Sequence, residues 1–194
     1  AIEAAHPEVR CYRYWPELSS DCRLMTKLLR DLTDYSMSDQ LTKQRSDLCN
    51  LLRRAYLSCL PLTEGTNKTL TYTSRVSCAY MPLDSPKMME ALLNLIVNAL
   101  DAVSDNGSVQ IILTKSNEQF VVSITDDGCG IAPKQLLTIF HPFTTTKPDG
   151  TGLGLPVAKR IIEGHGGHIR VISAPNQGAT FTFLLPCSFS SDRK

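Results

Sequence analysis

Three glycines at alternate positions mark the part of this chain best suited to bind an anion. They are Gly150, Gly152 and Gly154. A helix is predicted to begin directly after them, near Pro156, and its first turn offers free N–H groups and the positive end of the helix dipole. Thr151 adds a hydroxyl group and Lys147 a positive charge. The pattern predicts a phosphate site that is not a Walker loop, since neither GKS nor GKT ends it; alone, it also fits a flexible glycine loop.

A polar stripe runs along one face of an otherwise apolar predicted helix. Asn94, Asn98 and Asp101 follow at spacings of four and three residues, so they share that face. Asparagines in a buried helix need hydrogen-bond partners. A ligand or a hydrated metal ion supplies them, and so does an internal hydrogen-bond network. The stripe by itself does not decide between the two.

An acidic residue ends a predicted hydrophobic strand in the segment DDGCG. At the end of a strand, Asp126 can accept a hydrogen bond from the amine of a nucleobase, while Gly128 and Gly130 let the backbone approach closely. The pattern alone is equally that of a strand followed by a turn. A polar helix stripe, a base-reading acid and a phosphate loop in this order are far more specific than any one of them. Together they predict a nucleotide site.

The elements that must position these residues alternate between helical and strand patterns. Predicted helices run from Ser46 or Asp47 to about Cys59, from Asp84 or Ser85 to about Val103, and from Pro156 to Glu163. Predicted strands cover Thr71–Ala79, Ser108–Lys115, Phe120–Thr125, His168–Ala174 and Thr180–Pro186. Helices grouped against a mostly antiparallel sheet predict an α+β fold, a two-layer α/β sandwich.

The N-terminal segment has a different pattern. Between Pro16 and Tyr35 the apolar residues follow steps of four and three, which predicts one long, coiled-coil-like helix with a heptad seam. These residues are Leu18, Cys22, Met25, Leu29 and Leu32. Such a seam needs a partner helix, although an amphipathic helix lying on its own domain has the same pattern. The polar stretch Ser36–Gln44 is predicted to be a linker.

Composition narrows the classes of partner. With 194 residues, 42% of them hydrophobic, one domain with an added arm is expected. A net charge of +1 gives no reason to expect nucleic acid or an anionic membrane as partner. The longest apolar run, Ala91–Leu100, is too short to span a bilayer, so no direct membrane insertion is expected. Seven scattered cysteines without a CxxC pair are expected to be reduced core thiols of a cytoplasmic protein.

Over Lys87 to Pro186 the chain resembles the ATP-binding catalytic domain of the sensor histidine kinases of two-component systems, within the GHKL (HATPase) superfamily. The matching segments are NLIVNALDA for the N box, DDGCGI for the G1 box, IFHPFTTTK for the F box, GTGLGL for the G2 box and GATF for the last glycine motif. Their order and spacing both fit. The resemblance implies a Bergerat-type ATP-binding fold, with ATP and Mg²⁺ as cofactors. It also implies transfer of the γ-phosphate to a histidine, for relay to the receiver domain of a response regulator.

The resemblance also implies roles for single residues. Asn98 would coordinate Mg²⁺, and Asn94 would support that end of the site. Lys147 would reach toward the terminal phosphates, and Asp126 would bind the adenine amine. We therefore expect Asn94 and Lys147 to be catalytic. Residues expected to contact the nucleotide are Asn98, Asp101, Asp126, Gly128, Gly130, Ile131, Phe140, Thr146, Gly150, Thr151, Gly152, Leu153, Gly154 and Thr180.

A mobile lid is a further implication, covering about Ala132 to Asp149 and anchored by Phe140 and Phe143. Related hydrolases carry a glutamate as general base four residues before the magnesium asparagine. This chain has Asn94 there, and an amide cannot take the proton, so transfer to an outside nucleophile is favoured over hydrolysis. The alternatives are a GHKL-type ATPase or serine kinase, and a degenerate dimerisation or docking module.

The resemblance divides the chain into a second dimerisation helix (1–36), a linker (37–46), the catalytic domain (47–188) and a tail (189–194). A homodimer through the N-terminal helix is expected in the full-length protein. His6 lacks the spacing of an acceptor histidine and precedes a proline, so the acceptor is expected outside this chain. The sequence HGGH, with His165 and His168, is expected to be a glycine turn between a helix and a strand rather than a metal site. Cys129 is expected to have no redox role.

Overall fold

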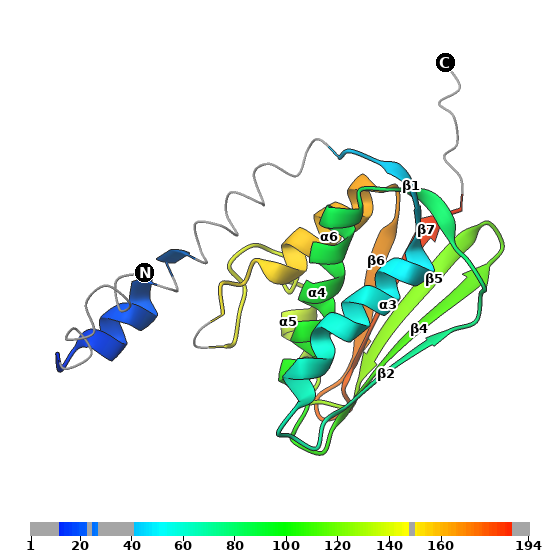
Figure 1. Ribbon diagram of the computed structural model, residues 1–194. Coiled ribbons are helices and arrows are strands. Elements are labelled where there is room, and N and C mark those ends of the chain that lie inside the picture. Colours follow the sequence, from blue (N-terminus) through cyan, green and yellow to red (C-terminus); the bar gives the residue numbers. More distant parts are fainter. Residues whose placement is uncertain (1–11, 23–24, 27–40, 148–149, 188–194) are drawn as a thin grey trace.

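A five-stranded sheet, covered on one face by helices, makes up the body of the protein (Figure 1). The computed structural model describes residues 12–22, 25–26, 41–147 and 150–187. In spatial order the strands are β2 (Thr69–Ser74), β4 (Ser108–Ser116), β5 (Gln119–Asp126), β7 (Ala179–Pro186) and β6 (His168–Ser173). Strands β2 and β4 run parallel, and the other neighbours run antiparallel. The predicted two-layer α+β sandwich is confirmed.

Three helices form the second layer. They are α3 (Leu48–Cys59), α4 (Ser85–Ala102) and α6 (Gly154–Gly164). Aspartates cap the first two: Asp47 accepts a hydrogen bond from the Cys49 N–H, and Asp84 accepts one from the Lys87 N–H. Both helix starts were predicted from these capping residues. Helix α4 packs against both of the others, so it is the central element of the layer.

The core lies between the layers and follows from the two hydrophobic periods. On α4 the buried residues recur every three or four positions, which gives one continuous apolar stripe. They are Met88, Ala91, Leu92, Leu95, Ile96, Ala99 and Leu100. On β4 and β5 every second residue is buried, as a sheet with one covered face requires. Each fully buried Leu or Ile contributes about 1.5–3 kcal/mol to folding.

Two strand predictions were wrong in detail. The single strand expected over Thr71–Ala79 ends at Ser74, because the Ser74 hydroxyl bonds both the N–H and the carbonyl oxygen of Val76 and turns the chain. A second strand, β3 (Tyr80–Leu83), then follows. It pairs with β1 (Gln44–Asp47), where a linker was expected. Alternation is too short to detect in four residues.

Smaller differences lie around the glycine loop. Helix α6 begins at Gly154, two residues before the predicted start. A short helix, α5 (Pro133–Leu136), lies within the segment expected to be a lid.

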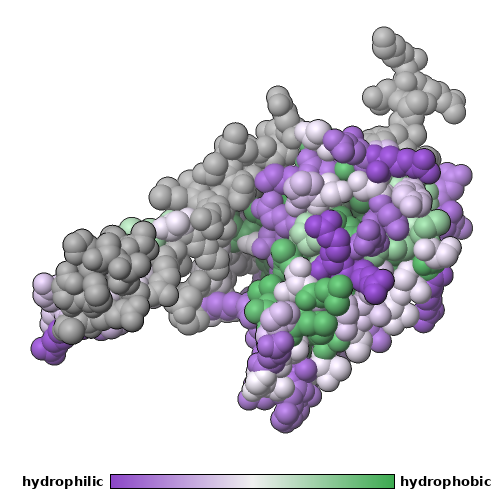
Figure 2. Space-filling view, in the orientation of Figure 1, coloured by the Kyte–Doolittle hydropathy of each residue, from purple (hydrophilic) through white to green (hydrophobic). Residues whose placement is uncertain are grey.

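The 3-10 helix η2 (Leu60–Thr63) extends α3. On the face shown in Figure 2 an apolar patch covers the region of α3 in Figure 1; Leu57 on α3 is 50% exposed and Leu62 on η2 is 54% exposed.

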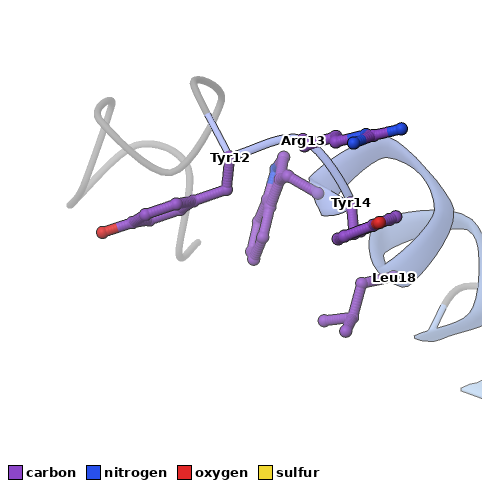
Figure 3. Close-up of a pocket in the computed structure, with 5 residues that line it drawn as sticks. Tyr12, Arg13, Tyr14 and Leu18 are labelled. Carbon is purple, nitrogen blue, oxygen red and sulfur yellow. The ribbon is translucent and has the colours of Figure 1, made fainter.

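The N-terminal helical segment lies apart from this body in Figure 1. Residues 15–22 and 25–26 are helical, so Pro16 lies in the first turn as predicted. Of the predicted seam, Leu18, Cys22 and Met25 are described and exposed, whereas Leu29 and Leu32, like His6, lie outside the described residues. A hollow of about 380 Å³ lies at the start of this helix, lined by Tyr12, Arg13, Tyr14, Trp15 and Leu18. Figure 3 shows these side chains. The lining of the hollow is almost wholly apolar, which makes it unsuitable for phosphate.

The cysteines are only in part the core thiols that the composition suggested, since Cys49 and Cys187 pack partly buried against the core. Among the described cysteines only Cys59 is buried, whereas Cys22, Cys78 and Cys129 are exposed. They lie on the open faces of helices and in loops, where a small side chain needs no burial.

No helix in the described ranges is both long enough and apolar enough to span a bilayer.

Candidate functional site

Asp126 ends β5 with its side chain directed into the protein. The residue is only 4% exposed. Its Oδ1 accepts hydrogen bonds from the N–H of Gly128 at 3.0 Å and from the N–H of Ala179, on the neighbouring strand β7, at 3.2 Å. Burial raises the pKa of this carboxyl above its ordinary value, although the two N–H donors oppose the shift. Two strands thus hold one carboxylate in a fixed orientation.

The loop after Asp126 is tied down on both sides by backbone hydrogen bonds. The Cys129 N–H donates to the carbonyl oxygen of Ala102, at the end of α4, at 3.2 Å. The Cys129 carbonyl accepts from the Asn176 N–H at 2.7 Å. Gly130 has a φ of +68°, and a Cβ there would overlap the carbonyl oxygen of Ala174. Only glycine fits at this position.

Thr180 and Ile131 flank this loop. The Thr180 hydroxyl is 3.2 Å from that of Thr125 on β5, so the pair links two strands beside Asp126. The Ile131 N–H donates to the Ser173 hydroxyl at 2.9 Å, while the Ile131 side chain packs partly buried against the core. The structure therefore brings Asp126 and the loop glycines together at one end of the sheet, whereas the side chains of Thr125 and Thr180 lie beside them on the opposite face.

The polar stripe of α4 meets the glycine loop. A Cβ at Gly154, the first residue of α6, would lie 3.3 Å from Asn94 Oδ1, so the Asn94 side chain lies directly beside the start of that helix. Along α4, Asn94 and Ala102 are about 12 Å apart at 1.5 Å per residue. The site therefore extends along α4 from the glycine loop to the loop after Asp126.

Asn98 and Asp101 lie between these ends and hold a cation. The Lys147 ammonium donates to Asn98 Oδ1 at 3.2 Å and to Asp101 Oδ2 at 2.8 Å. The Lys147 and Asp101 side chains are 42% and 52% exposed. Sequence reasoning placed all three residues in the site, but it did not predict this ion pair, which joins residues 46 positions apart.

The glycine loop is bound to the segment before it. Gly152 has a φ of +67°, and its carbonyl oxygen accepts from the Phe143 N–H at 3.0 Å. The Gly150 N–H donates to the Lys147 carbonyl at 3.1 Å. Leu153 is buried, so only its backbone can face a ligand, and its N–H bonds the buried Thr151 hydroxyl at 3.4 Å.

The two phenylalanines expected to anchor the lid differ. Phe140 packs edge-on against Phe181 of β7, with ring centroids 6.4 Å apart, and the Lys159 ammonium lies 5.4 Å from its ring. The prediction for Phe143 was wrong, because its side chain is 63% exposed and only its backbone is anchored. Its φ of +64° is unusual for a bulky residue. Thr146 is exposed beside Lys147.

Sequence reasoning missed the Ala179 N–H as a partner of Asp126, and no local pattern signals it.

The segment HGGH forms the expected turn between α6 and β6, with His165 buried and His168 exposed. No three His, Cys, Asp or Glu side chains are grouped to hold a metal ion within the described part of the chain.

Comparisons with known proteins agree with this geometry. Residues 83–188 match the family described as histidine kinase-, DNA gyrase B- and HSP90-like ATPase. The chain is 32% identical over 170 residues to the sensor histidine kinase ZraS of Salmonella typhimurium strain LT2. This match covers 87% of the chain but 37% of ZraS, so the chain spans little more than a third of that relative.

Two solved structures are similar over most of the chain. The nucleotide-free catalytic domain of the histidine kinase ThkA has a TM-score of 0.70 and 29% identity, covering 76% of this chain and 97% of that domain. Full-length ShkA in complex with AMPPNP has a TM-score of 0.79 and 25% identity. That match covers 89% of this chain and 38% of ShkA.

Proposed function

The chain belongs to the histidine kinase-, DNA gyrase B- and HSP90-like ATPase family, and we propose that it is the ATP-binding catalytic part of a sensor histidine kinase. It transfers the ATP γ-phosphate to a histidine on a separate dimerisation helix, for relay to the receiver domain of a response regulator. The observation that carries kinase over hydrolase activity is the Asn94 carboxamide beside Gly154. A carboxamide cannot act as the general base that water attack requires.

The adenine base binds at Asp126 in this proposal. Both backbone N–H donors bond Oδ1, so Oδ2 is the oxygen that accepts from the adenine amine. The loop glycines Gly128 and Gly130 leave the backbone open to the ring, and Thr180 lies on the strand beside it. A carboxylate held by two backbone donors is preorganised to read an amine, because it needs no rearrangement on binding.

The residues of α4 fit a magnesium ion. Asn98 Oδ1 and Asp101 Oδ2 already hold one cation, the Lys147 ammonium. Where Mg²⁺ is bound together with phosphates, the protein typically supplies only one or two oxygen ligands. Asn98 would be a direct ligand, and Asp101 would hold a coordinated water. Bound Mg²⁺ supplies charge neutralisation between the phosphates.

The triphosphate lies over the glycine loop, within reach of the backbone N–H groups before α6. Lys147, which bonds Asn98 and Asp101 at the edge of this loop, would pair with the terminal phosphate. Positioning and charge stabilisation account for most of the acceleration in phosphoryl transfer, so these contacts are the catalytic contribution of the chain. Asn94 keeps the phosphate end of α4 against α6.

The rest of the chain is assigned in the same proposal. Residues 1–36 are assigned to the segment of the second dimerisation helix, 37–46 to its connection with the body, of which residues 44–46 lie in β1, 47–188 to the catalytic domain and 189–194 to a tail. The helix makes a homodimer with its counterpart in the parent protein. The catalytic domain works in the cytoplasm, where ATP and the response regulator are available.

Calorimetric titration with Mg²⁺ and AMPPNP tests the proposal directly. The unmodified chain is compared with Asp126→Asn and Asn98→Ala, and a His168→Asn variant on the exposed start of β6 is the matched control. We expect the first two variants to bind at least tenfold more weakly and the control to bind normally. A folded chain that binds no nucleotide would sink the kinase proposal and favour a docking module. Steady ATP hydrolysis without an added histidine-bearing helix would favour the ATPase alternative.

A further inference from the structure

A buried histidine joins the two helices of the site at their far ends. His165, the residue after α6, is 1% exposed. Its Nδ1 is 2.7 Å from the carbonyl oxygen of Ile161, and its Nε2 accepts a hydrogen bond from the Asp84 N–H at 2.9 Å. A backbone N–H can only donate, so Nε2 carries no proton. The neutral ring therefore has its proton on Nδ1 and donates it to Ile161.

Asp84 is the meeting point of three segments. It caps α4 through Oδ1, its Oδ2 accepts from the Thr42 N–H at 2.8 Å, and its own N–H bonds His165. Nearby, the Lys43 ammonium donates to the Gly164 carbonyl at 2.7 Å. The chain entering the catalytic domain is thus attached to the start of α4 and to the end of α6.

The candidate phosphate site lies further along the same helices, at the middle of α4 and at the first residue of α6. Asp84 meets His165, and ten residues further along α4 Asn94 meets Gly154. Gly154 and His165 are eleven residues apart on α6, so the helices are antiparallel and cover about 15 and 17 Å between the two contacts. An axial slip at the His165 end would move Asn94 relative to the glycine loop by the same amount, because helices are stiff along their axes.

We infer that His165 is a positioning residue of the nucleotide site, which sets the register of α4 against α6 through its bond to the Asp84 N–H. The inference rests on the proposed function in so far as the site binds nucleotide. His165 touches no substrate and acts through the helices that carry Asn94 and Gly154.

Protonation of the ring would break this contact, since a protonated Nε2 cannot accept. Two charged groups face the ring: the Lys43 ammonium of the entering segment, which disfavours its protonation, and the Asp84 carboxylate at the start of α4, which favours it. Burial has the largest effect and lowers the pKa of His165 below its ordinary value of 6.5. The neutral contact is therefore complete above pH 6.5 and is lost as the pH falls through the lowered pKa.

Two variants test the accepting nitrogen of the ring, Nε2, separately from the donating nitrogen, Nδ1. The longer side chain of His165→Gln places an amide oxygen near the position of Nε2, where it accepts from Asp84 and does not titrate. The shorter side chain of His165→Asn reaches Ile161 only. His168→Asn, three residues away and exposed, is the matched control. All are measured in the full chain by calorimetry with Mg²⁺ and AMPPNP, and by NMR of the Asn94 and Asn98 side-chain amides.

We expect His165→Asn to bind AMPPNP about tenfold more weakly, which is the loss expected when one hydrogen bond to a charged group is misplaced. The side-chain amide signals of Asn94 and Asn98 should shift in this variant. His165→Gln should bind like the unmodified chain at pH 7. As the pH falls from 6.5 through the lowered pKa of His165, the affinity of the unmodified chain should fall relative to that of His165→Gln. The ratio reports on the ring alone, because protonation of the nucleotide affects both proteins equally. A merely structural histidine would leave that ratio constant.

A folded His165→Asn variant with unmodified affinity and unmoved Asn94 and Asn98 signals overturns the inference. If that variant does not fold, the pH-dependent ratio of the unmodified chain to His165→Gln decides: a constant ratio overturns the inference and a falling one supports it. If the unmodified chain binds no nucleotide, the proposed function fails. The amide signals alone then test the register, and they must move in His165→Asn but not in His165→Gln.

Discussion

The two ends of the candidate site are built in different ways. At the end that includes Asp126, backbone groups make the contacts, and the carboxylate is 4% exposed between two N–H donors. At the other end backbone bonds tie the glycine loop to the segment before it, but that segment meets α4 through the Lys147 side chain, and the Lys147–Asp101 pair is about half exposed. Backbone hydrogen bonds inside a sheet hold one geometry, whereas exposed ion pairs exchange partners easily. The Asp126 end, which we propose binds the base, is therefore preformed, and the Lys147 end, which we propose binds the phosphates, can rearrange around a ligand.

Gly130→Ala should give the largest effect, because it attacks the preformed end. The substitution forces a side chain into the left-handed region and into the Ala174 carbonyl, so we expect a loss of about 3 kcal/mol in the free energy of unfolding. Urea denaturation measures it. Gly65→Ala is the control, since Gly65 has a φ of +77° with nothing within 4 Å, and it should cost only about 1 kcal/mol. Equal losses in the two variants would contradict a tightly packed loop.

Asp126→Asn should separate binding from stability at the same end. Loss of a hydrogen bond to a charged group costs about 1.5–3 kcal/mol, so the affinity for AMPPNP and for AMP should both fall by about 10- to 100-fold. The free energy of unfolding should not fall, because burial disfavours the carboxylate and the amide oxygen still accepts from Gly128 and Ala179. Calorimetry and urea denaturation check both expectations. A variant that unfolds easily would make Asp126 a structural residue.

Lys147→Met tests the adaptable end. Exposed ion pairs contribute less than about 1 kcal/mol, so the stability should hardly change. We expect affinity for AMPPNP to fall about fivefold, since one phosphate contact is lost, while affinity for AMP stays the same. The two titrations are made side by side. An equal loss for both nucleotides would mean that Lys147 contributes to the base end, and the contrast between the ends would disappear.

The pH dependence of Asp126 should give the smallest effect. Its folded pKa is raised above the ordinary value of 3.8 by burial, so the folded state holds this proton more tightly than the unfolded state. Its contribution to stability therefore declines as the pH rises from 3.8 through the folded pKa. The stability of Asp126→Asn relative to the unmodified chain should grow over this interval. Urea denaturation at several pH values measures the difference, and a constant difference would contradict a buried, ionised carboxylate.

Much of this architecture could be predicted because its signals are local. Asp47 and Asp84 mark the starts of α3 and α4, and the strands β4 and β5 were found from alternation alone. The short strands β1 and β3 were missed, because four residues carry too little pattern. The exposure of Phe143 was also missed, since its anchoring role was taken from the family resemblance and no local pattern reports which loop residues are buried.

The sequence by itself determined which residue types stand where: a carboxylate after a strand, glycines where the backbone must turn, and amides on one face of α4. Such features depend on neighbours within a few positions. The tertiary structure decided which atoms meet. Asp126 receives the Ala179 N–H from 53 positions away, and the His165 ring receives the Asp84 N–H from 81 positions away. No local pattern contains these contacts, because they arise only when burial of the apolar faces packs distant elements together.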